Sequence, residues 1–354
     1  MNTLDTLVRG WGREEPASSG KGILKSMKDF FIADAAKFDN EIITSYFVLS
    51  SFQVREKKMG GQFLAITLTD KTGSFEGRMW DDVADPIATC AEGCFVKAQG
   101  QISKYQGKFQ ITIQKLRAAA ESEIDPTDYL PVTRFDINEM WNELRGYVEQ
   151  FSSPDLRRLV FAFLDDPQIA AAYQTAPAAK RLHHAWIGGL LEHVLTLVRV
   201  CRATVPFYPE VDPDLLVTGA ILHDIGKIRE LSWKSSFGYT LEGQMIGHIS
   251  IAQRMLHEKV LSLAPFPEKL SMLVEHLILS HHGKYEFGSP KLPMTPEAIL
   301  LSALDDLEAK MQTLRSEFAS AAASGKSAGE MTEWVRSMER PLLDSLAFLK
   351  DEQE

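Results

Sequence analysis

The sequence is poor in cysteine and has no long uninterrupted apolar run. Three cysteines in 354 residues cannot cross-link a chain of this size, so a reducing, cytoplasmic compartment is expected. Cys90 and Cys94 also have no second pair with which to complete a zinc site. The first residues contain no apolar segment, so no secretory signal is predicted. The longest apolar stretch, residues 188–201, is interrupted by charged residues, which argues against a membrane-spanning helix.

Basic residues are fewer than acidic ones. There are 38 Lys and Arg against 48 Asp and Glu, and the formal net charge is −10. This balance argues against a generally basic nucleic-acid coat, although a local basic groove remains compatible with it. Residues 1–125 are nearly neutral, so almost all of the excess acidity lies in residues 126–354. Binding of metal cations is one reason for such an acidic segment.

Residues 41–116 show the two-residue period of β-strands. Turn signals at Asp70–Gly73 and Lys104–Gly107 each join two alternating segments. The strands predicted beside these turns cover residues 63–69, 74–80, 95–102 and 109–113. Short strands at this spacing, with glycine at the bends, predict a small barrel or sandwich.

After a linker with several prolines, the period becomes helical and stays so to the end of the chain. Thr295-Pro296 is a strong start signal, because Thr is a good N-cap and Pro suits the first helical position. The predicted helices cover residues 137–151, 154–164, 186–203, 213–224, 247–263, 267–281 and 295–318. Residues 319–354 are expected to form further helical pieces around Gly325. The sequence therefore predicts a multidomain β + α protein with an all-α second domain.

Histidine carries the strongest functional signal, since all nine histidines lie between residues 183 and 282. Imidazole and carboxylate ligands suit Mn, Fe, Zn or Mg. A pair of ions about 3.5–4 Å apart needs a bridging carboxylate, and Asp224 in the His223-Asp224 doublet is placed to bridge. Asp305 lies in a leucine-rich helix, where an unpaired carboxylate is costly to bury. The candidate metal ligands are His193, His223, Asp224, His248, His281, His282 and Asp305.

Each of these residues also has an ordinary structural interpretation. Taken alone, His193 would be a hydrogen-bonded core residue, His281-His282 a helix C-terminus, and Asp305-Asp306 a half-exposed helix face. Only the combination favours a metal site. His257 and His276 do not fit the helical phase of His248 and His281, so we expect them to be structural or exposed.

The order of these ligands resembles the HD-domain metal-dependent phosphohydrolase superfamily. Local segments are more specific still: KRLHHAWIGGLLEHV, GAILHDIGKIREL, GQMIGHISIAQRM and ILSHHGKYEFGSPKLPMTPEAILLSALDDLEAKM. With FLAITLTDKTGSFEGRMWDD in front, residues 26–318 are similar to the YhaM-type 3′→5′ exoribonucleases. One departure is Glu308, where a second aspartate is expected after the Asp305-Asp306 pair. Because Glu308 lies one turn beyond Asp305, we expect it not to affect metal binding.

The resemblance implies a small OB-like β-barrel followed by an all-α HD-domain helical bundle. The implied segments are a loose leader (1–25), the OB-fold (26–120), a linker (121–135), the HD domain (136–318) and a helical tail (319–354). It also implies a metal-dependent 3′→5′ exoribonuclease acting on single-stranded RNA, and on single-stranded DNA as an open question. Two divalent ions are expected, with Mn first and Fe, Zn, Mg, Co or Ni open, together with a homo-oligomer.

The same resemblance, together with position, suggests the catalytic residues. Asp224 holds the ions, and Lys227 neutralises charge on the phosphate. Arg181, His183 and His184 hold the phosphate or protonate the leaving 3′-oxygen. Helix capping by Lys227 and surface positions for the other three are the structural alternatives.

On the barrel, aromatic and basic side chains predicted to point outward are candidates for binding a single strand. They are Phe63, Arg78, Trp80, Lys97, Tyr105 and Lys108. Each aromatic residue taken alone is more often part of a core.

Two other functions remain open from the sequence. The first is an HD-domain phosphohydrolase of nucleotides or cyclic dinucleotides. The front barrel argues against it, and so does Gly283-Lys284-Tyr285 after the histidine pair, where cyclic-di-GMP enzymes carry a Gly-Tyr-Pro extension. The second is a non-catalytic nucleic-acid adaptor with a structural metal. More than four candidate ligands exceed what a closed tetrahedral site requires.

Overall fold

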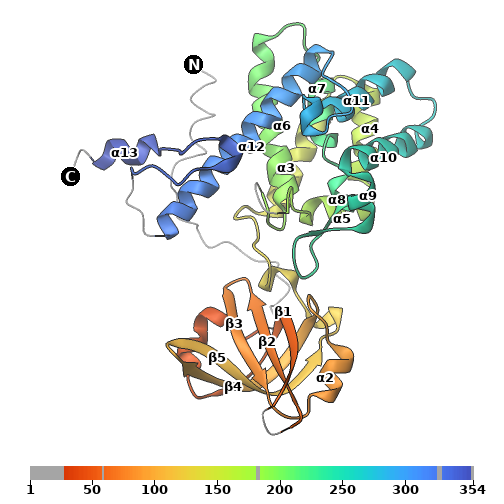
Figure 1. The fold of residues 1–354 in the computed structure, drawn as a ribbon. Helices are drawn as coiled ribbons and strands as arrows, with labels where there is room; N and C mark the ends of the chain where they lie inside the picture. Colours follow the sequence, from red (N-terminus) through yellow and green to blue (C-terminus); the bar gives the residue numbers. More distant parts are fainter. Residues whose placement is uncertain (1–27, 58–59, 181–183, 325–328, 352–354) are drawn as a thin grey trace.

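The computed structural model describes residues 28–57, 60–180, 184–324 and 329–351. A β-barrel and a helical domain follow one another along the chain and lie side by side in space (Figure 1). The predicted leader, residues 1–25, falls outside the described residues. Of the helices that are described, none is long and apolar enough to cross a membrane.

The barrel is closed by five strands in the order β1-β2-β3-β5-β4. Neighbouring strands are antiparallel except β3 and β5, which are parallel. The strands are β1 (Ile42–Glu56), β2 (Gln62–Asp70), β3 (Gly73–Met79), β4 (Phe95–Tyr105) and β5 (Lys108–Ala118). A short helix, α2 (Ala84–Thr89), connects β3 and β4. The predicted barrel is thus confirmed; β2, β4 and β5 extend beyond the predicted strands, whereas β3 begins and ends one residue earlier than predicted.

The alternation seen in the sequence matches the two sides of the barrel wall. Leu64, Ile66 and Leu68 of β2 are buried inside, while their neighbours in the chain point outward. Gly100 lies where the ladder between β4 and β5 shifts register, and a Cβ there would stand 2.3 Å from the carbonyl oxygen of Thr112. Glycine therefore permits the close approach of the two strands.

The outer surface of the barrel has one side covered by the linker. Tyr46 and Val48 of β1 form a small apolar cluster there with Tyr129, and Phe95 of β4 packs against it. The linker thereby joins the barrel to the helical domain along the β1–β4 face.

The helical domain surrounds a central helix. α7 (Pro213–Leu222) is apolar on all sides and buried from Leu215 to Leu222. It packs against α4, α6, α11 and α12. The other helices are α3 (Ile137–Glu149), α4 (Pro154–Leu164), α5 (Pro167–Thr175), α6 (Gly189–Thr204), α8 (Lys227–Glu230), α9 (Leu241–Ile246), α10 (His248–Ser262), α11 (Glu268–Ser280), α12 (Pro296–Ala323) and α13 (Ser345–Asp351).

Several helix predictions were wrong in detail, and the short helices α8 and α9 were not predicted. α5 was not predicted, although Asp166-Pro167 carries the same start signal as Thr295-Pro296; the Asp166 side chain accepts hydrogen bonds from the first turn. α6 begins at Gly189 rather than Trp186, because Gly188 adopts a left-handed φ of 80°. α12 continues past Phe318 to Ala323. Gly325, around which tail helices were expected, lies outside the described residues.

A two-stranded hairpin, β6 (Leu231–Ser232) and β7 (Gly238–Tyr239), follows α8 and extends toward the barrel (Figure 1). Lys234 and Ser235 at its tip line a cavity of about 440 Å³ together with Cys94 and Phe95 of the barrel. The barrel therefore lies against the hairpin that follows α8.

Candidate metal centre and active site

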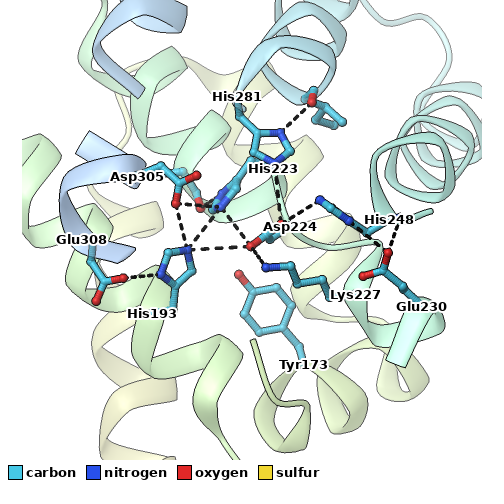
Figure 2. Close-up of polar contacts among 12 residues, drawn as sticks. Tyr173, His193, His223, Asp224, Lys227, Glu230, His248, His281, Asp305 and Glu308 are labelled. Carbon is cyan, nitrogen blue, oxygen red and sulfur yellow. Dashed lines mark hydrogen bonds and ion pairs between the residues drawn. The ribbon is translucent and has the colours of Figure 1, made fainter. Parts of the chain in front are cut away.

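The predicted ligands converge from five helices. His223 and Asp224 follow α7, and His193 lies in α6. His248 begins α10, His281-His282 follows α11, and Asp305 lies in α12. Figure 2 shows His193, His223, His248 and His281 around Asp224, with Asp305 beside His193 and His223. The helical core thus places residues more than 100 positions apart in one cluster.

One group of ligand atoms lies on the α6 and α12 side of Asp224. His193 Nε2 is 3.3 Å from His223 Nε2 and 3.2 Å from Asp305 Oδ1. Asp224 Oδ2 is 3.3 Å from His223 Nε2 and 3.8 Å from His193 Nε2. Because metal–ligand distances are about 2.0–2.2 Å, two ligands of one ion lie about 3–4 Å apart. These four atoms therefore have the spacing of a single coordination sphere.

A second group lies on the α10 and α11 side. One ligand atom from each of His248, His281 and His282 lies within 4.8 Å of the others. Asp224 Oδ1 faces this group, 3.4 Å from His248 Nε2 and 3.7 Å from His281 Nε2. The two carboxylate oxygens of Asp224 thus face two different groups, which is the arrangement of a bridging ligand.

The residues present fit a pair of divalent ions. Within the described part of the chain, the buried atoms Asp224 Oδ1, His248 Nε2 and His281 Nε2 have no hydrogen-bond partner. Buried polar atoms are normally satisfied, so three orphaned atoms aimed at one point call for a ligand there. All three are good donors to first-row divalent cations and none is a thiolate, which suits Mn, Fe, Co, Ni or Zn.

Each histidine of the cluster is held through its other ring nitrogen. The Nδ1 atoms of His223, His281 and His282 lie 2.8–2.9 Å from the carbonyl oxygens of Ala220, Ile278 and Phe287. A carboxylate serves the remaining two, because His193 Nδ1 is 2.7 Å from Glu308 Oε2 and His248 Nδ1 is 3.2 Å from Glu230 Oε1. Such contacts keep the proton on Nδ1 and leave Nε2 free to bind metal.

Charge in the cluster is set by close neighbours. Burial alone would raise the pKa of Asp224, but Lys227 and His223 hold that pKa well below its usual value. Burial would lower the pKa of Lys227, yet Asp224 raises it above its ordinary value. Hydrogen bonding to His193 lowers the pKa of Asp305 against the opposing effect of burial. At neutral pH the carboxylates are therefore ionised and Lys227 is charged.

An open pocket of about 250 Å³ gives access to the cluster. Lys227 lines it, with Nζ 2.6 Å from Asp224 Oδ2, so this lysine lies within reach of anything bound at the metal groups. Phe287 lines the same pocket, with 56% of its surface exposed, and the Lys284 ammonium lies 5.1 Å from its ring centre.

His184 does not occupy the place predicted for it. Its side chain is buried, and Nε2 lies 2.8 Å from Glu308 Oε1. A buried imidazole with this partner cannot meet a phosphate or a leaving oxygen, so the predicted direct role was wrong. Arg181 and His183, which were predicted to act beside it, lie outside the described residues.

Glu308 lies next to a candidate metal ligand. It is 4% exposed, and its two oxygens contact His193 and His184. Hydrogen bonds from these two residues lower its pKa, against burial, which would raise it. Because Glu308 contacts the Nδ1 of a candidate metal ligand, this contact argues against the expectation that Glu308 has no bearing on metal binding.

Two histidines lie apart from the cluster, as expected. His257 is exposed, and His276 accepts a hydrogen bond from the backbone N–H of Met294. Sequence reasoning missed Glu230, which also accepts from the backbone N–H of His248. It missed the fully buried Tyr173, whose hydroxyl donates to Ile221 beneath the site. Neither residue has a spacing that signals its contact, since both contacts depend on tertiary packing.

The structure separates the six candidate residues of the barrel. Arg78, Tyr105 and Lys108 line one groove, of about 940 Å³, over β2, β3 and β5. Phe63, at the start of β2, and Trp80, directly after β3, stack with ring centres 4.7 Å apart. Lys97 lies on the other face, opposite Tyr46 in β1 and beside the linker. Lys97 therefore does not share the groove of Arg78.

Two family models match the chain. Residues 52–119 match an OB-fold nucleic acid binding domain, and residues 190–310 match the HD domain. Both matches fall on the elements described above: the first covers most of the barrel, and the second covers the helices that carry the cluster. The chain thus consists of an N-terminal OB-like barrel and a helical HD domain.

Curated relatives match over most of the chain. The 3′-5′ exoribonuclease YhaM of Bacillus velezensis is 36% identical over 77% of this chain and 86% of its own length. YhaM of Bacillus subtilis is 34% identical over 84% and 93%. YhaM of Halalkalibacterium halodurans is 32% identical over 84% and 91%. With this identity over most of both chains, and with both domains matched in order, the protein belongs to the YhaM family of 3′-5′ exoribonucleases.

Proposed function

We propose that this protein is a metal-dependent 3′→5′ exoribonuclease of single-stranded RNA, with two divalent ions shared by Asp224. The observation that carries the proposal is the position of the Asp224 carboxylate, whose oxygens face separate groups of histidine and aspartate. The names of the relatives support the substrate and the direction of degradation.

The chain's own residues have distinct tasks in this proposal. His193, His223 and Asp305 would hold one ion, while His248, His281 and His282 would hold the other. When bound, such a pair supplies Lewis-acid activation of a phosphodiester and of water. Lys227 then stabilises negative charge on the phosphate, because its ammonium lies in the pocket beside Asp224. Phe287 offers an aromatic face to the base next to that phosphate.

In this proposal the barrel binds the single-stranded RNA. OB barrels bind single strands by stacking bases on aromatic rings beside a basic groove. The groove of Arg78, Tyr105 and Lys108, with the exposed Trp80, supports this use of the open face. The hairpin β6–β7, which extends from the end of α8 to the barrel, suits a path from groove to pocket.

Several finer features are proposals as well. Mn²⁺ is the metal we expect, and single-stranded DNA is a second substrate to test. The free thiols of Cys90, Cys94 and Cys201 support a reducing, cytoplasmic location. We also propose a homo-oligomer, to be checked by light scattering, and the segments 26–120 and 136–318 as the two functional units.

The direct test uses single-stranded RNA labelled at its 5′ end, incubated with purified protein and Mn²⁺. A 3′→5′ exonuclease shortens the labelled strand one nucleotide at a time and gives a ladder. RNA labelled at its 3′ end should release the label at once as a mononucleotide. Release of short 5′-labelled products from the start would contradict the direction. Efficient hydrolysis of nucleoside triphosphates or cyclic dinucleotides with RNA left intact would favour the other phosphohydrolase class.

The barrel groove gives a separate prediction. Trp80→Ala should weaken binding of single-stranded RNA by about 5-fold or more, because a stacked base is worth about 1–3 kcal/mol by alanine substitution. Arg78→Ala should weaken it as well and flatten its salt dependence. Binding is measured by fluorescence anisotropy without divalent metal, so that the strand stays intact.

Lys97→Ala is the matched control, since it removes a cation from the covered face of the same barrel. All three variants should hydrolyse a small chromogenic phosphodiester at the wild-type rate. Equal losses from Lys97→Ala and Arg78→Ala would show that the open face has no special part in binding.

A further inference from the structure

Both carboxylate oxygens of Glu308 make buried contacts next to the candidate metal ligands. Oε2 lies 2.7 Å from His193 Nδ1, and Oε1 lies 2.8 Å from His184 Nε2. The helix α12 places Glu308 one turn after Asp305, so both carboxylates face α6. One turn of α12 thus contacts both ring nitrogens of His193: Asp305 faces Nε2 and Glu308 faces Nδ1 (Figure 2).

His184, His193 and Glu308 have the residue types of a further metal site. The distances between them, however, indicate direct hydrogen bonds rather than a shared metal ion. Separations of 2.7 and 2.8 Å are those of charge-assisted hydrogen bonds. Two ligands around one ion with bonds of about 2.0–2.2 Å would stand farther apart. The three side chains therefore form a chain of hydrogen bonds that ends at His193.

His184 is fixed in place from several sides. Its backbone has a φ of 49°, which is uncommon for a residue with a side chain, and its carbonyl accepts from Ala178 and Trp186. The Trp186 ring packs edge-on against the imidazole, with ring centres 5.1 Å apart. A Cβ at Gly189 would stand 2.0 Å from the His184 carbonyl oxygen, so glycine at the start of α6 permits the close packing of the His184 backbone.

The layer continues to the linker between the domains. Glu192 Oε2 accepts from Trp186 Nε1 at 2.8 Å and from the Thr133 hydroxyl at 2.6 Å. Glu192 Oε1 lies 3.8 Å from His184 Nδ1. Thr133 belongs to the linker, which pairs with Ile187 through backbone hydrogen bonds. Hydrogen bonds thus join the linker to Glu192, which lies near His184, but His184 Nδ1 itself has no hydrogen-bond partner among the described residues.

We propose that Glu308 is a positioning residue that orients His193 for metal binding, and that His184 holds Glu308 in place. The inference rests on the proposed two-metal site. A carboxylate on the distal nitrogen of a metal-bound histidine fixes the ring and its tautomer, and loss of such a partner typically costs about 10–100-fold in metal affinity or activity. Because His193 is the candidate metal ligand that Glu308 contacts, the ion held by His193 should be affected and the other spared.

The test measures metal binding itself. Full-length protein stripped of metal is titrated with Mn²⁺ by calorimetry, and the Co²⁺-loaded form is followed by visible absorption. Glu308→Ala should weaken one of the two sites by about 10–100-fold and alter the Co²⁺ spectrum. Glu308→Gln, of nearly the same size, should fall between wild type and Ala, because its amide oxygen accepts from only one imidazole.

Glu317→Ala, farther along α12 and outside the site, is the matched control and should bind both ions as wild type does. The far-UV circular dichroism of each variant establishes folding, and Glu308→Gln remains informative if the alanine variant does not fold. Two unchanged sites and an unchanged Co²⁺ spectrum in Glu308→Gln and Glu308→Ala would overturn the inference. Wild-type protein that binds two ions without degrading RNA would instead refute the proposed function and leave this inference standing.

Discussion

Asp224→Asn is expected to abolish RNA hydrolysis and to prevent metal binding by both groups of ligands, while the helical domain stays folded. The change keeps the size of the side chain and removes the charge shared by the two groups. Removal of one charge-stabilising group from an active site typically costs about 10²–10³-fold. Since Asp224 contributes to both groups, the loss should exceed about 10³-fold. Turnover of labelled RNA and metal content by mass spectrometry measure the two effects.

A matched control separates this effect from a general loss of charge. Asp155→Asn removes an exposed carboxylate whose partner is Arg158 in the same helix, and it should leave turnover and metal content unchanged. Circular dichroism should be the same for wild type and both variants. Substantial turnover by Asp224→Asn with only one ion bound would show that the carboxylate does not bridge, and the site would then depend on a single metal.

The sequence predicted the architecture well because the two domains have different periods. Alternation along Phe63–Thr69 matches a barrel wall with one face buried, and the apolar helix ending at His223-Asp224 is the centre of the bundle. The clustering of histidines likewise anticipated which side chains meet. Periodicity and residue clustering are properties of the sequence itself, so they can be recognised without knowledge of tertiary contacts.

The errors arose where a tertiary contact decides the role of a residue. His184 was expected in contact with the phosphate, but burial against Glu308 removes it from the pocket. Lys97 alternates outward as predicted, yet strand order places it two strands from Arg78 around the barrel. Glu308 is different, since its spacing of three from Asp305 already indicated a shared helix face. This spacing already placed the Glu308 side chain on the same side of the helix as Asp305, and therefore near the same histidine.

Lys227→Ala should lower turnover by about 10²-fold or more without loss of metal, the scale seen when one group that stabilises transition-state charge is removed. In the structure the Lys227 ammonium is 2.6 Å from Asp224 Oδ2 and lines the metal pocket. An ammonium cannot bind a cation, and it competes with one for that oxygen. Its removal should therefore leave metal affinity unchanged or raise it. A purely structural role would lower metal affinity and turnover together.

A fall in turnover without a fall in metal affinity distinguishes phosphate binding by Lys227 from helix capping. Lys227→Arg should recover part of the turnover, because the charge remains but the planar guanidinium is larger than the compact ammonium. Lys37→Ala, which removes an exposed lysine of the barrel, controls for net charge and should match wild type in both measurements. Mn²⁺ titration and single-turnover hydrolysis of RNA under saturating metal provide the comparison. Wild-type turnover by Lys227→Ala would show that the ammonium only neutralises Asp224 before the ions bind, and charge on the phosphate would then be stabilised by the ions themselves.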